Sequence, residues 1–423
     1  GVKVRILVLG SGAKDHAAVW WLSQSAFISE LFVAPGNPGT EDIATNLYST
    51  DPSNPEEVYR AIKEHNIESV FIGTEAPLLS GVKEYLSERG ITCFGASKEA
   101  LKLEDDRAFS RSFSHRHNIP VPENSVFKDL DSLETFLDQH PDTRYTIKAN
   151  TITPSRIMLS SSDKYALLNY AQGLLQKGPI LLEKHIDGLH ATATLFVDKN
   201  GYLLLPLANE YTNVSHFQGT PTGGMGAIAP IPINDTIKEE IKTKIVEPTL
   251  KGLKEEGLAY SGVLTLSIII TKDGPILVDY HVRLNDPATQ AMVPIIKTDI
   301  IEIMVAMKEN RLSSVKLELN NLSTVAVVLA SYGYPMDPII GKEITGLSNA
   351  FLMNTENKPL VFIGAIKKTP DGRFFTNGGR CITVVGRAQS LEGANMQAYK
   401  LIKDKNFSSL WYRDDIGNKF FNQ

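Results

Sequence analysis

The amino-acid sequence predicts an α/β protein whose N-terminal part is built on a parallel β-sheet. Short apolar strands alternate with helical segments over residues 5–95, and each strand ends in a loop that contains Gly, Pro, Asn or Thr. A glycine pair also stands between the first strand and the first helix. Such alternation favours parallel strands with helices on both faces, and such sheets bind ligands at the carboxyl ends of their strands.

The N-terminal segment is predicted to contain four strands and three helices. The strands are expected at residues 5–9, 31–34, 69–73 and 92–95, and the helices at residues 15–24, 55–64 and 79–89. This order is Rossmann-like. The loops that follow the strands are therefore expected to converge on one crevice; they are residues 10–12, 34–40 and 73–78.

The remaining chain is predicted to form a small α/β segment, a strand-rich segment and an α+β end. A charged helix over residues 98–117 comes first. The small segment has strands at 145–149 and 180–184 and a helix at 164–175. The strand-rich segment has strands at 192–197, 203–207, 264–270 and 276–280 and a helix at 235–256. The last segment has a strand at 324–330 and a helix at 391–404.

The composition is that of a globular protein and excludes several functional classes. The 423 residues carry a net charge of −5, so no basic surface for nucleic acid is expected. No apolar stretch approaches the ~20 residues of a membrane span, and the chain enters a strand at once, so no signal peptide is expected. Two cysteines cannot build a disulfide or zinc framework and fit a cytoplasmic location. A monomer and a homodimer are equally compatible with the composition.

The turn after the first strand predicts a phosphate site. Gly10 and Gly12 lie between an apolar strand and a helix start, where backbone N–H groups and the helix dipole hold anions. Asp15 occupies the place of the third glycine of a dinucleotide motif, so a nicotinamide site is not expected. The loop 34–40 offers further N–H groups, although a plain turn explains it equally simply. Glu75 is either a ligand for a ribose diol or a solvated loop charge.

Two later stretches also contain residues suited to ligand binding. The glycine cluster at 222–227 lets the backbone approach a ligand closely, and a loop without a ligand is the alternative. The strand ending near residue 280 places Asp279, His281 and Arg283 on one face. With Asn285 and Asp286 nearby, these residues predict a divalent cation and a carboxylate held by Arg283. The alternative is a polar strand end with a structural Arg–Asp pair.

Taken in order, these motifs identify a family. The matching stretches are residues 10–17, 34–40, 75–78, 94–98, 222–227, 283–290, 333–335, 376–380 and 412–417. The chain resembles the glycinamide ribonucleotide synthetases (phosphoribosylamine–glycine ligases), which are ATP-grasp enzymes of purine synthesis. The resemblance runs from end to end, and it is the ordered set of motifs that makes it specific.

The resemblance implies a fold and a reaction. It implies an N-terminal Rossmann-like, phosphoribosylamine-binding domain at residues 1–102, and an ATP-grasp region at residues 103–322 with a lid at about 121–190. An α+β domain at residues 323–423 completes the chain. ATP would phosphorylate the glycine carboxylate with Mg or Mn present, and phosphoribosylamine would attack the acyl phosphate to give glycinamide ribonucleotide. The expected partners are these small molecules.

The resemblance also implies roles for individual residues. Those expected around phosphoribosylamine are Gly12, Asn37, Gly39, Thr40, Glu75 and Pro77. Those expected around glycine and the acyl phosphate are Gly223, Gly224, Met225 and Gly226, with Arg283 and Asp286 as catalytic residues. Those expected around the nucleotide are Arg107, Lys148, Glu183 and His190, and the expected metal ligands are Asp279 and His281.

The departures from the family pattern lie at the expected nucleotide site. The family's glycine-rich lid corresponds here to residues 150–157, which contain no glycine and one proline. Asp279 and His281 stand where the family has Glu and Asn. An alternative therefore stays open: a relative with lost or altered ATP chemistry, acting as a ligand-binding protein or as a ligase for another acid and amine.

Overall fold

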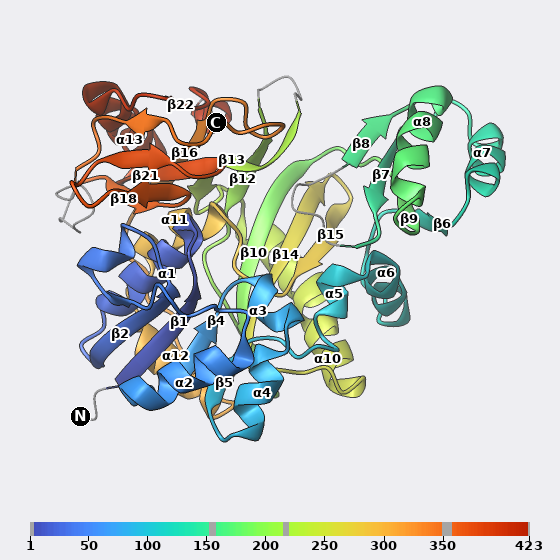
Figure 1. Cartoon of the computed structure of the whole chain (residues 1–423). Coiled ribbons are helices and arrows are strands. Elements are labelled where there is room, and N and C mark those ends of the chain that lie inside the picture. The colour runs from blue at the N-terminus through green and yellow to red at the C-terminus, as the bar shows by residue number, and fades with distance from the viewer. Residues whose placement is uncertain (1–3, 152–157, 215–219, 349–357, 422–423) are drawn as a thin grey trace.

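A computed structural model shows the arrangement of the chain and describes residues 4–151, 158–214, 220–348 and 358–421 (Figure 1). The predicted α/β fold class is confirmed. Figure 1 shows the N-terminal sheet and its helices beside the C-terminal sheet, with a smaller lobe around α7 and α8 at the opposite end of the molecule. Most of the expected lid stretch, residues 152–157, lies outside the described residues.

The N-terminal segment is a five-stranded parallel sheet in the order β3-β2-β1-β4-β5. Its strands are β1 (Val4–Gly10), β2 (Ile28–Pro35), β3 (Thr45–Asn46), β4 (Ser69–Ile72) and β5 (Thr92–Phe94). Its helices are α1 (Ala13–Ser23), α2 (Pro55–His65), α3 (Glu75–Leu79) and α4 (Val82–Glu88), with the short 3-10 helix η1 (Thr40–Asp42). The helix predicted at 79–89 is replaced by α3 and α4, because Gly81 adopts a φ of +77° between them.

The lid lobe is a four-stranded sheet in the order β6-β9-β7-β8, in which every pairing is antiparallel. Its strands are β6 (Asn124–Phe127), β7 (Tyr145–Ala149), β8 (Met158–Ser161) and β9 (Ile180–Lys184), and its helices are α7 (Leu130–Gln139) and α8 (Lys164–Leu175). Leu133, Ile147 and Leu167 belong to a core cluster of its own. The lobe is therefore packed separately from the sheets that flank it.

The central sheet has the order β11-β10-β14-β15. Its strands are β10 (Leu189–Val197), β11 (Tyr202–Leu204), β14 (Gly262–Thr271) and β15 (Gly274–His281). The helices of this region are α5 (Lys102–Asp105), α6 (Arg107–Arg116), α9 (Asp235–Ile241), α10 (Glu247–Glu255), α11 (Ala288–Met292) and α12 (Ile300–Lys308), with the π-helix η2 (Lys242–Val246) and the 3-10 helices η3 (Val293–Ile295) and η4 (Leu312–Ser314). The helix predicted at 98–117 is divided at Asp106, whose carboxylate caps α6 by accepting from the Phe109 amide.

The C-terminal sheet combines strands from the middle and the end of the chain, in the order β12-β13-β16-β21-β18. Its strands are β12 (Asn209–Asn213), β13 (Pro221–Ala229), β16 (Ser323–Ser331), β18 (Leu360–Ile363) and β21 (Arg380–Ala388). β22 (Leu410–Trp411) pairs with β16, and β17 (Glu343–Ile344), β20 (Phe374–Thr376) and β19 (Ile366–Lys368) form a small sheet. α13 (Leu391–Lys405) and η6 (Asn418–Phe420) complete the region. The glycine cluster at 222–227 is therefore part of a strand, not a loop. Over the described ranges, the helices are too short or too polar to cross a bilayer.

Candidate functional site

A cavity of about 440 Å³ lies where the carboxyl ends of β1, β2 and β4 face the residues that follow β15. We call it the strand-end cavity. It brings together six of the residues that the sequence predicted for the substrates, namely Gly12, Glu75, Pro77, Gly223, Arg283 and Asp286. Lys14, Asp15 and Arg380 also line it, although no site role was predicted for them.

The glycine turn after β1 is closed by carboxylates of the protein itself. The Gly12 amide donates to Asp15 Oδ2 at 2.9 Å, and the Lys14 amide donates to Asp286 Oδ2 at 3.1 Å. Gly10 has a φ of +152°, and a Cβ there would overlap the Asp15 carboxyl group. Burial raises the pKa of Asp15 to about 6. Two amides that were expected to hold a phosphate are thus already bonded to side chains.

The loop that follows β2 uses its polar side chains to hold itself together. Asn37 Nδ2 donates to the carbonyl oxygens of Ser11, at 2.9 Å, and Ile363, at 2.7 Å. Asn37 Oδ1 accepts from the amides of Gly39 and Thr40. The Asn37 side chain therefore joins the first domain to β18, and the structure places Asn37, Gly39 and Thr40 outside the strand-end cavity.

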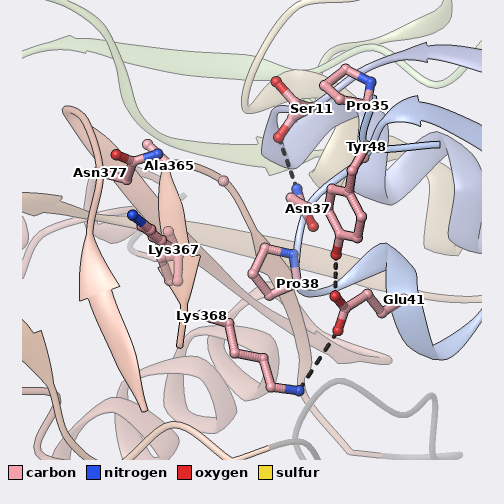
Figure 2. Close-up of a pocket in the computed structure, with 13 residues that line it drawn as sticks. Ser11, Pro35, Asn37, Pro38, Glu41, Tyr48, Ala365, Lys367, Lys368 and Asn377 are labelled. Atoms are coloured by element: carbon pink, nitrogen blue, oxygen red, sulfur yellow. Dashed lines mark hydrogen bonds and ion pairs between the residues drawn. The ribbon is translucent and has the colours of Figure 1, made fainter. Parts of the chain in front are cut away.

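A second cavity, of about 570 Å³, lies between this loop and β19 (Figure 2). It shares Ser11 and Pro35 with the strand-end cavity, so the two adjoin. Figure 2 shows Glu41 between the hydroxyl group of Tyr48 and Lys368, whose Nζ lies 3.6 Å from the Glu41 carboxylate. These contacts connect the N-terminal loops to the small C-terminal sheet.

Arg283 is held at the cavity by two carboxylates. Its Nε lies 3.0 Å from Glu104 Oε2 and 3.3 Å from Glu75 Oε2. Glu104 also contacts His281 Nδ1 at 3.0 Å and accepts from the Val282 amide. Burial alone would raise the pKa of Glu104, but the charge of Arg283 and the bond with His281 lower it to about 2. Glu104 therefore stays ionised and orients the Arg283 guanidinium.

Asp286 joins three segments of the chain at the other side of the cavity. Its Oδ1 accepts from Gln290 Nε2 at 2.8 Å and lies 3.3 Å from Arg380 Nη1. Lys14 Nζ donates to the neighbouring Leu284 carbonyl at 3.2 Å, and burial lowers the pKa of Lys14. These contacts bring the basic groups Lys14 and Arg380 into the cavity wall beside Asp286.

Three of the four predicted positions in β13 serve packing. A Cβ at Gly224 would lie 2.7 Å from Pro287 Cδ, and a Cβ at Gly226 would overlap the Ile416 side chain. Met225 is fully buried. Gly223 alone of the four lines the strand-end cavity, and its amide donates to the Tyr334 hydroxyl oxygen at 2.8 Å. The glycines thus allow β13 to pack closely against the residues that follow β15 and against Ile416.

A third cavity, of about 440 Å³, lies between the lid sheet and the central sheet. We call it the lid cavity. Four residues predicted for the nucleotide and metal line it, namely Lys148, Glu183, His190 and Asp279. Arg107 lies beside it, with its Nε 3.3 Å from Asp279 Oδ1. The expected nucleotide residues are therefore gathered at one place.

A cluster of charged side chains lies at the lid cavity, and Lys148, Glu183 and Asp279 of this cluster line its wall. Lys148 Nζ lies 2.7 Å from Glu183 Oε1 and 3.3 Å from Asp279 Oδ2. Arg111 Nη2 lies 2.6 Å from Glu183 Oε2 and 3.9 Å from Asp279 Oδ1. Burial alone would raise the pKa of Asp279, but Lys148, Arg107 and Arg111 hold it below its ordinary value. Asp279 is therefore an anion bound to cations.

These residues do not fit a metal centre of protein ligands. His281 is bonded to other residues, with its Nε2 3.2 Å from Ser267 Oγ and its Nδ1 3.0 Å from Glu104 Oε2. Across the described part of the chain there is no group of three His, Cys, Asp or Glu side chains placed to hold a metal ion. Mg²⁺ prefers oxygen ligands, and both Asp279 oxygens contact cations that would repel it.

Besides Asp15, sequence reasoning missed four residues of these sites. Lys14 and Arg380 belong to motifs that match the family, so the signal was present. Glu104 and Arg111 lie in the charged stretch predicted as one helix, where nothing distinguishes Glu104 from Asp105 as a partner for Arg283. Their importance depends on contacts with β9 and β15 that the local sequence does not reveal.

Three family models match consecutive segments of the chain. Residues 4–104 match the N domain of phosphoribosylglycinamide synthetase, residues 105–289 match its ATP-grasp (A) domain, and residues 324–419 match its C domain. The order of the matches is the order of the N-terminal sheet, the central region and the C-terminal sheet described above. The resemblance inferred from the motifs is thereby confirmed.

Individual relatives support the same assignment. The phosphoribosylamine–glycine ligase of Caldanaerobacter subterraneus is 32% identical over 98% of this chain and 99% of its own length. The trifunctional purine biosynthetic protein adenosine-3 of Gallus gallus is 32% identical over 98% of this chain, which spans only 42% of that longer protein. The crystal structure of phosphoribosylamine–glycine ligase from Thermotoga maritima is 28% identical, with a TM-score of 0.82, and the match covers 97% of this chain and 100% of the other.

Proposed function

Because this chain belongs to the phosphoribosylglycinamide synthetase family, we propose that it is an ATP-dependent ligase that joins 5-phosphoribosylamine to glycine. The observation that carries the proposal is that two cavities adjoin one strand. Asp279 on β15 lines the lid cavity, and Arg283, two residues beyond that strand, lines the strand-end cavity. A nucleotide in the first would face an acid and an amine in the second.

The reaction proceeds in two steps. A glycine carboxylate oxygen attacks the γ-phosphorus of ATP, which forms an acyl phosphate and releases ADP. The amine nitrogen of phosphoribosylamine then attacks the acyl carbon, so a C–N bond forms, inorganic phosphate leaves and a proton is lost. The product is glycinamide ribonucleotide, an intermediate of purine synthesis. Both steps depend on holding the reacting groups close together and on neutralising phosphate charge.

We assign the substrates to the cavities by charge. Arg283, with its head group fixed by Glu75 and Glu104, suits the glycine carboxylate because a guanidinium fork matches a carboxylate. Lys14 and Arg380 supply the positive charge that a sugar phosphate requires in the same cavity. Lys148 and Arg107 do the same for the phosphates of ATP at the lid cavity.

Membership of the ATP-grasp class implies ATP binding and use of a divalent cation. The choice between magnesium and manganese remains a prediction. Because the side chains around Asp279 do not fit a metal centre, we assign no step of the reaction to a protein-bound metal. None of the comparisons favours the alternative of a ligand-binding relative without ligase activity.

The proposal also covers the cellular location, the domain division and the assembly of the protein. Both cysteines lie within the described ranges, are buried and are free, which fits the cytoplasmic location that we propose. We also propose the domain division at residues 1–102, 103–322 and 323–423, and a monomer or homodimer as the assembly.

A turnover experiment tests the function. The purified chain is mixed with ATP, magnesium, glycine and phosphoribosylamine, and ADP and glycinamide ribonucleotide are measured together. We expect both products in equal amounts, and neither above background when glycine is omitted. ADP release that does not depend on glycine, or no product at all, would contradict the proposal.

The Arg283→Lys variant tests the assignment of the acid. We expect the KM for glycine to rise at least about tenfold, because a lysine cannot bind a carboxylate through two parallel hydrogen bonds. The matched control is Arg311→Lys, at an arginine that is about half exposed and pairs only with Glu309 in the described residues. Equal KM values for the two variants would contradict the assignment.

A further inference from the structure

The charged cluster at the lid cavity has a different role from the one that the family pattern implies. We propose that Arg107, Lys148 and Arg111 form a phosphate-binding site, and that Asp279 is a counter-ion that positions them and not a metal ligand. The phosphates of the nucleotide are then neutralised by the protein's own cations, so nucleotide affinity depends little on a divalent ion. This inference rests on the proposed function in one respect, that the anion is ATP.

The first argument is the charge of the cluster. It contains the three cations Arg107, Lys148 and Arg111 and the two carboxylates Glu183 and Asp279, which leaves one net positive charge. Arg144, which precedes β7, and Lys184 at the end of β9 also line this cavity and carry positive charge. A divalent cation is repelled by this surface, whereas a polyphosphate is attracted to it.

The second argument is how the cluster is built. Lys148 and Arg111 are both 4% exposed, and each bridges Glu183 and Asp279, so their positions are fixed before any ligand binds. Asp279 lines the cavity and is 16% exposed, and Arg107 beside it is 20% exposed, so both side chains are partly open to solvent. Positioned cations lose little freedom when an anion binds, which favours affinity.

The third argument is an unpaired donor. Arg111 Nη1 is buried and has no hydrogen-bond partner among the residues that the structure describes. A buried donor without a partner is costly, and the group that satisfies it must be an acceptor. Phosphate oxygens are acceptors and a metal ion is not, so an anion could satisfy this group and a metal ion could not.

The two roles of Asp279 predict effects of opposite sign. If Asp279 were a metal ligand, Asp279→Asn would weaken binding of ATP with magnesium and leave metal-free binding unchanged. If Asp279 is a counter-ion, the same change removes a negative charge 3.3 Å from Arg107 Nε and Lys148 Nζ. The positive potential at the cavity then rises, and phosphates bind more tightly with or without metal.

The experiment is titration calorimetry of the full chain with ATP and, separately, with inorganic tripolyphosphate, each in excess magnesium and in EDTA. Tripolyphosphate tests the anion site without the nucleoside, so this result is independent of ligase activity. For the unchanged protein we expect the two buffers to give affinities within about threefold of each other. For Asp279→Asn we expect at least about tenfold tighter binding of both probes in EDTA.

Arg107→Gln is the second variant, because its partly exposed side chain makes a folding defect less of a concern than at a buried site. We expect binding of both probes to weaken about tenfold or more in both buffers. The matched control is Asp138→Asn, in the lid helix α7, where the carboxylate pairs with Lys164 and both side chains are partly exposed. We expect this control to bind both probes as the unchanged protein does.

Three outcomes would overturn the inference. The first is affinity for ATP that collapses in EDTA, and the second is weaker binding of ATP with magnesium in Asp279→Asn. The third is failure of tripolyphosphate to bind in either buffer. If the probes bind as expected but the turnover assay yields no product, the proposed ligase function fails while this anion site stands.

Discussion

Asp15 and His16 are adjacent buried residues whose pKa values are shifted by burial in opposite directions. Burial raises the pKa of Asp15 from 3.8 to about 6 and lowers the pKa of His16 from 6.5 to about 3. Burial thus keeps His16 neutral, and its Nδ1 accepts the Ile363 amide at 2.8 Å. On acidification below pH 6.5, unfolded His16 binds a proton that folded His16 does not, so stability falls as pH is lowered.

The contribution of Asp15 has the opposite sign. Between pH 3.8 and about 6, folded Asp15 keeps a proton that the unfolded chain has lost, so stability falls as pH rises. Between these pH values, the contribution of Asp15 to stability falls as pH rises, whereas the contribution of His16 increases. The pair therefore contributes little net pH dependence of stability, although each residue alone contributes a strong one.

The Asp15→Asn variant separates the two effects. Asparagine keeps an acceptor for the Gly12 amide but cannot titrate. Relative to the unchanged protein, the free energy of unfolding of the variant should increase by roughly 2–3 kcal/mol as pH rises from 3.8 to about 6. Urea unfolding at a series of pH values measures this. The control is Asp235→Asn, at a fully exposed carboxylate, and parallel profiles for both variants would contradict the prediction.

At the scale of elements, side-chain hydrogen bonds hold the backbone of β13 beside the strand-end cavity. Three of the four residues from Gly223 to Gly226 are glycines and offer no side chain of their own. The Gly223 amide donates to the Tyr334 hydroxyl oxygen, and the Gly224 amide donates to Thr222 Oγ1 at 3.0 Å. The position of this strand therefore depends on single hydrogen bonds near the cavity.

The Tyr334→Phe variant removes one of these bonds. The Gly223 amide loses its acceptor, so we expect about 1 kcal/mol less stability. We also expect a several-fold higher KM for the proposed substrates, because Gly223 lines their cavity. Thermal unfolding and steady-state kinetics measure the two effects. Tyr332→Phe is the matched control, at a tyrosine that is 50% exposed, and the same KM in both variants would argue against this role of Tyr334.

Element boundaries show where local patterns were sufficient. The N-terminal strands and helices were predictable because apolar periodicity is a local property of the sequence. The break between α3 and α4 and the break at Asp106 depend on single residues, a left-handed Gly81 and a capping carboxylate. No strand was predicted at β13, where glycine weakens the strand pattern, and its pairing with β16 involves residues about a hundred positions away.

At the scale of the molecule, the first domain and the C-terminal sheet are joined by bonds to one residue of β18. The Ile363 amide donates to His16, and the Ile363 carbonyl accepts from Asn37 Nδ2 at 2.7 Å. The strand-end cavity takes its walls from both regions, with Glu75 from the first domain and Arg380 from the C-terminal sheet. The cavity therefore exists only while the two regions are docked.

The Asn37→Ala variant tests this docking. Two backbone carbonyls lose a donor, so we expect a loss of roughly 2–4 kcal/mol of stability and faster hydrogen exchange at the Ile363 amide. The matched control is Asn54→Ala, which removes the cap of α2 and should cost about 1 kcal/mol. Exchange at Ile363 should not change in the control. Equal exchange at Ile363 in both variants would show that Asn37 does not hold the interface.

The sequence by itself determined the α/β class, the order of the regions, the family and several cavity residues, among them Glu75, Arg283 and Asp286. These follow from periodicity and from ordered motifs, which are carried by neighbouring residues. Only the tertiary structure decided that the Asn37 side chain forms its hydrogen bonds within the protein, that Glu104 orients Arg283, and that cations surround Asp279. The physical reason is that hydrogen-bonding and charged groups pair with partners far away in the chain. Burial makes those pairings obligatory, because an unpaired buried polar group is costly.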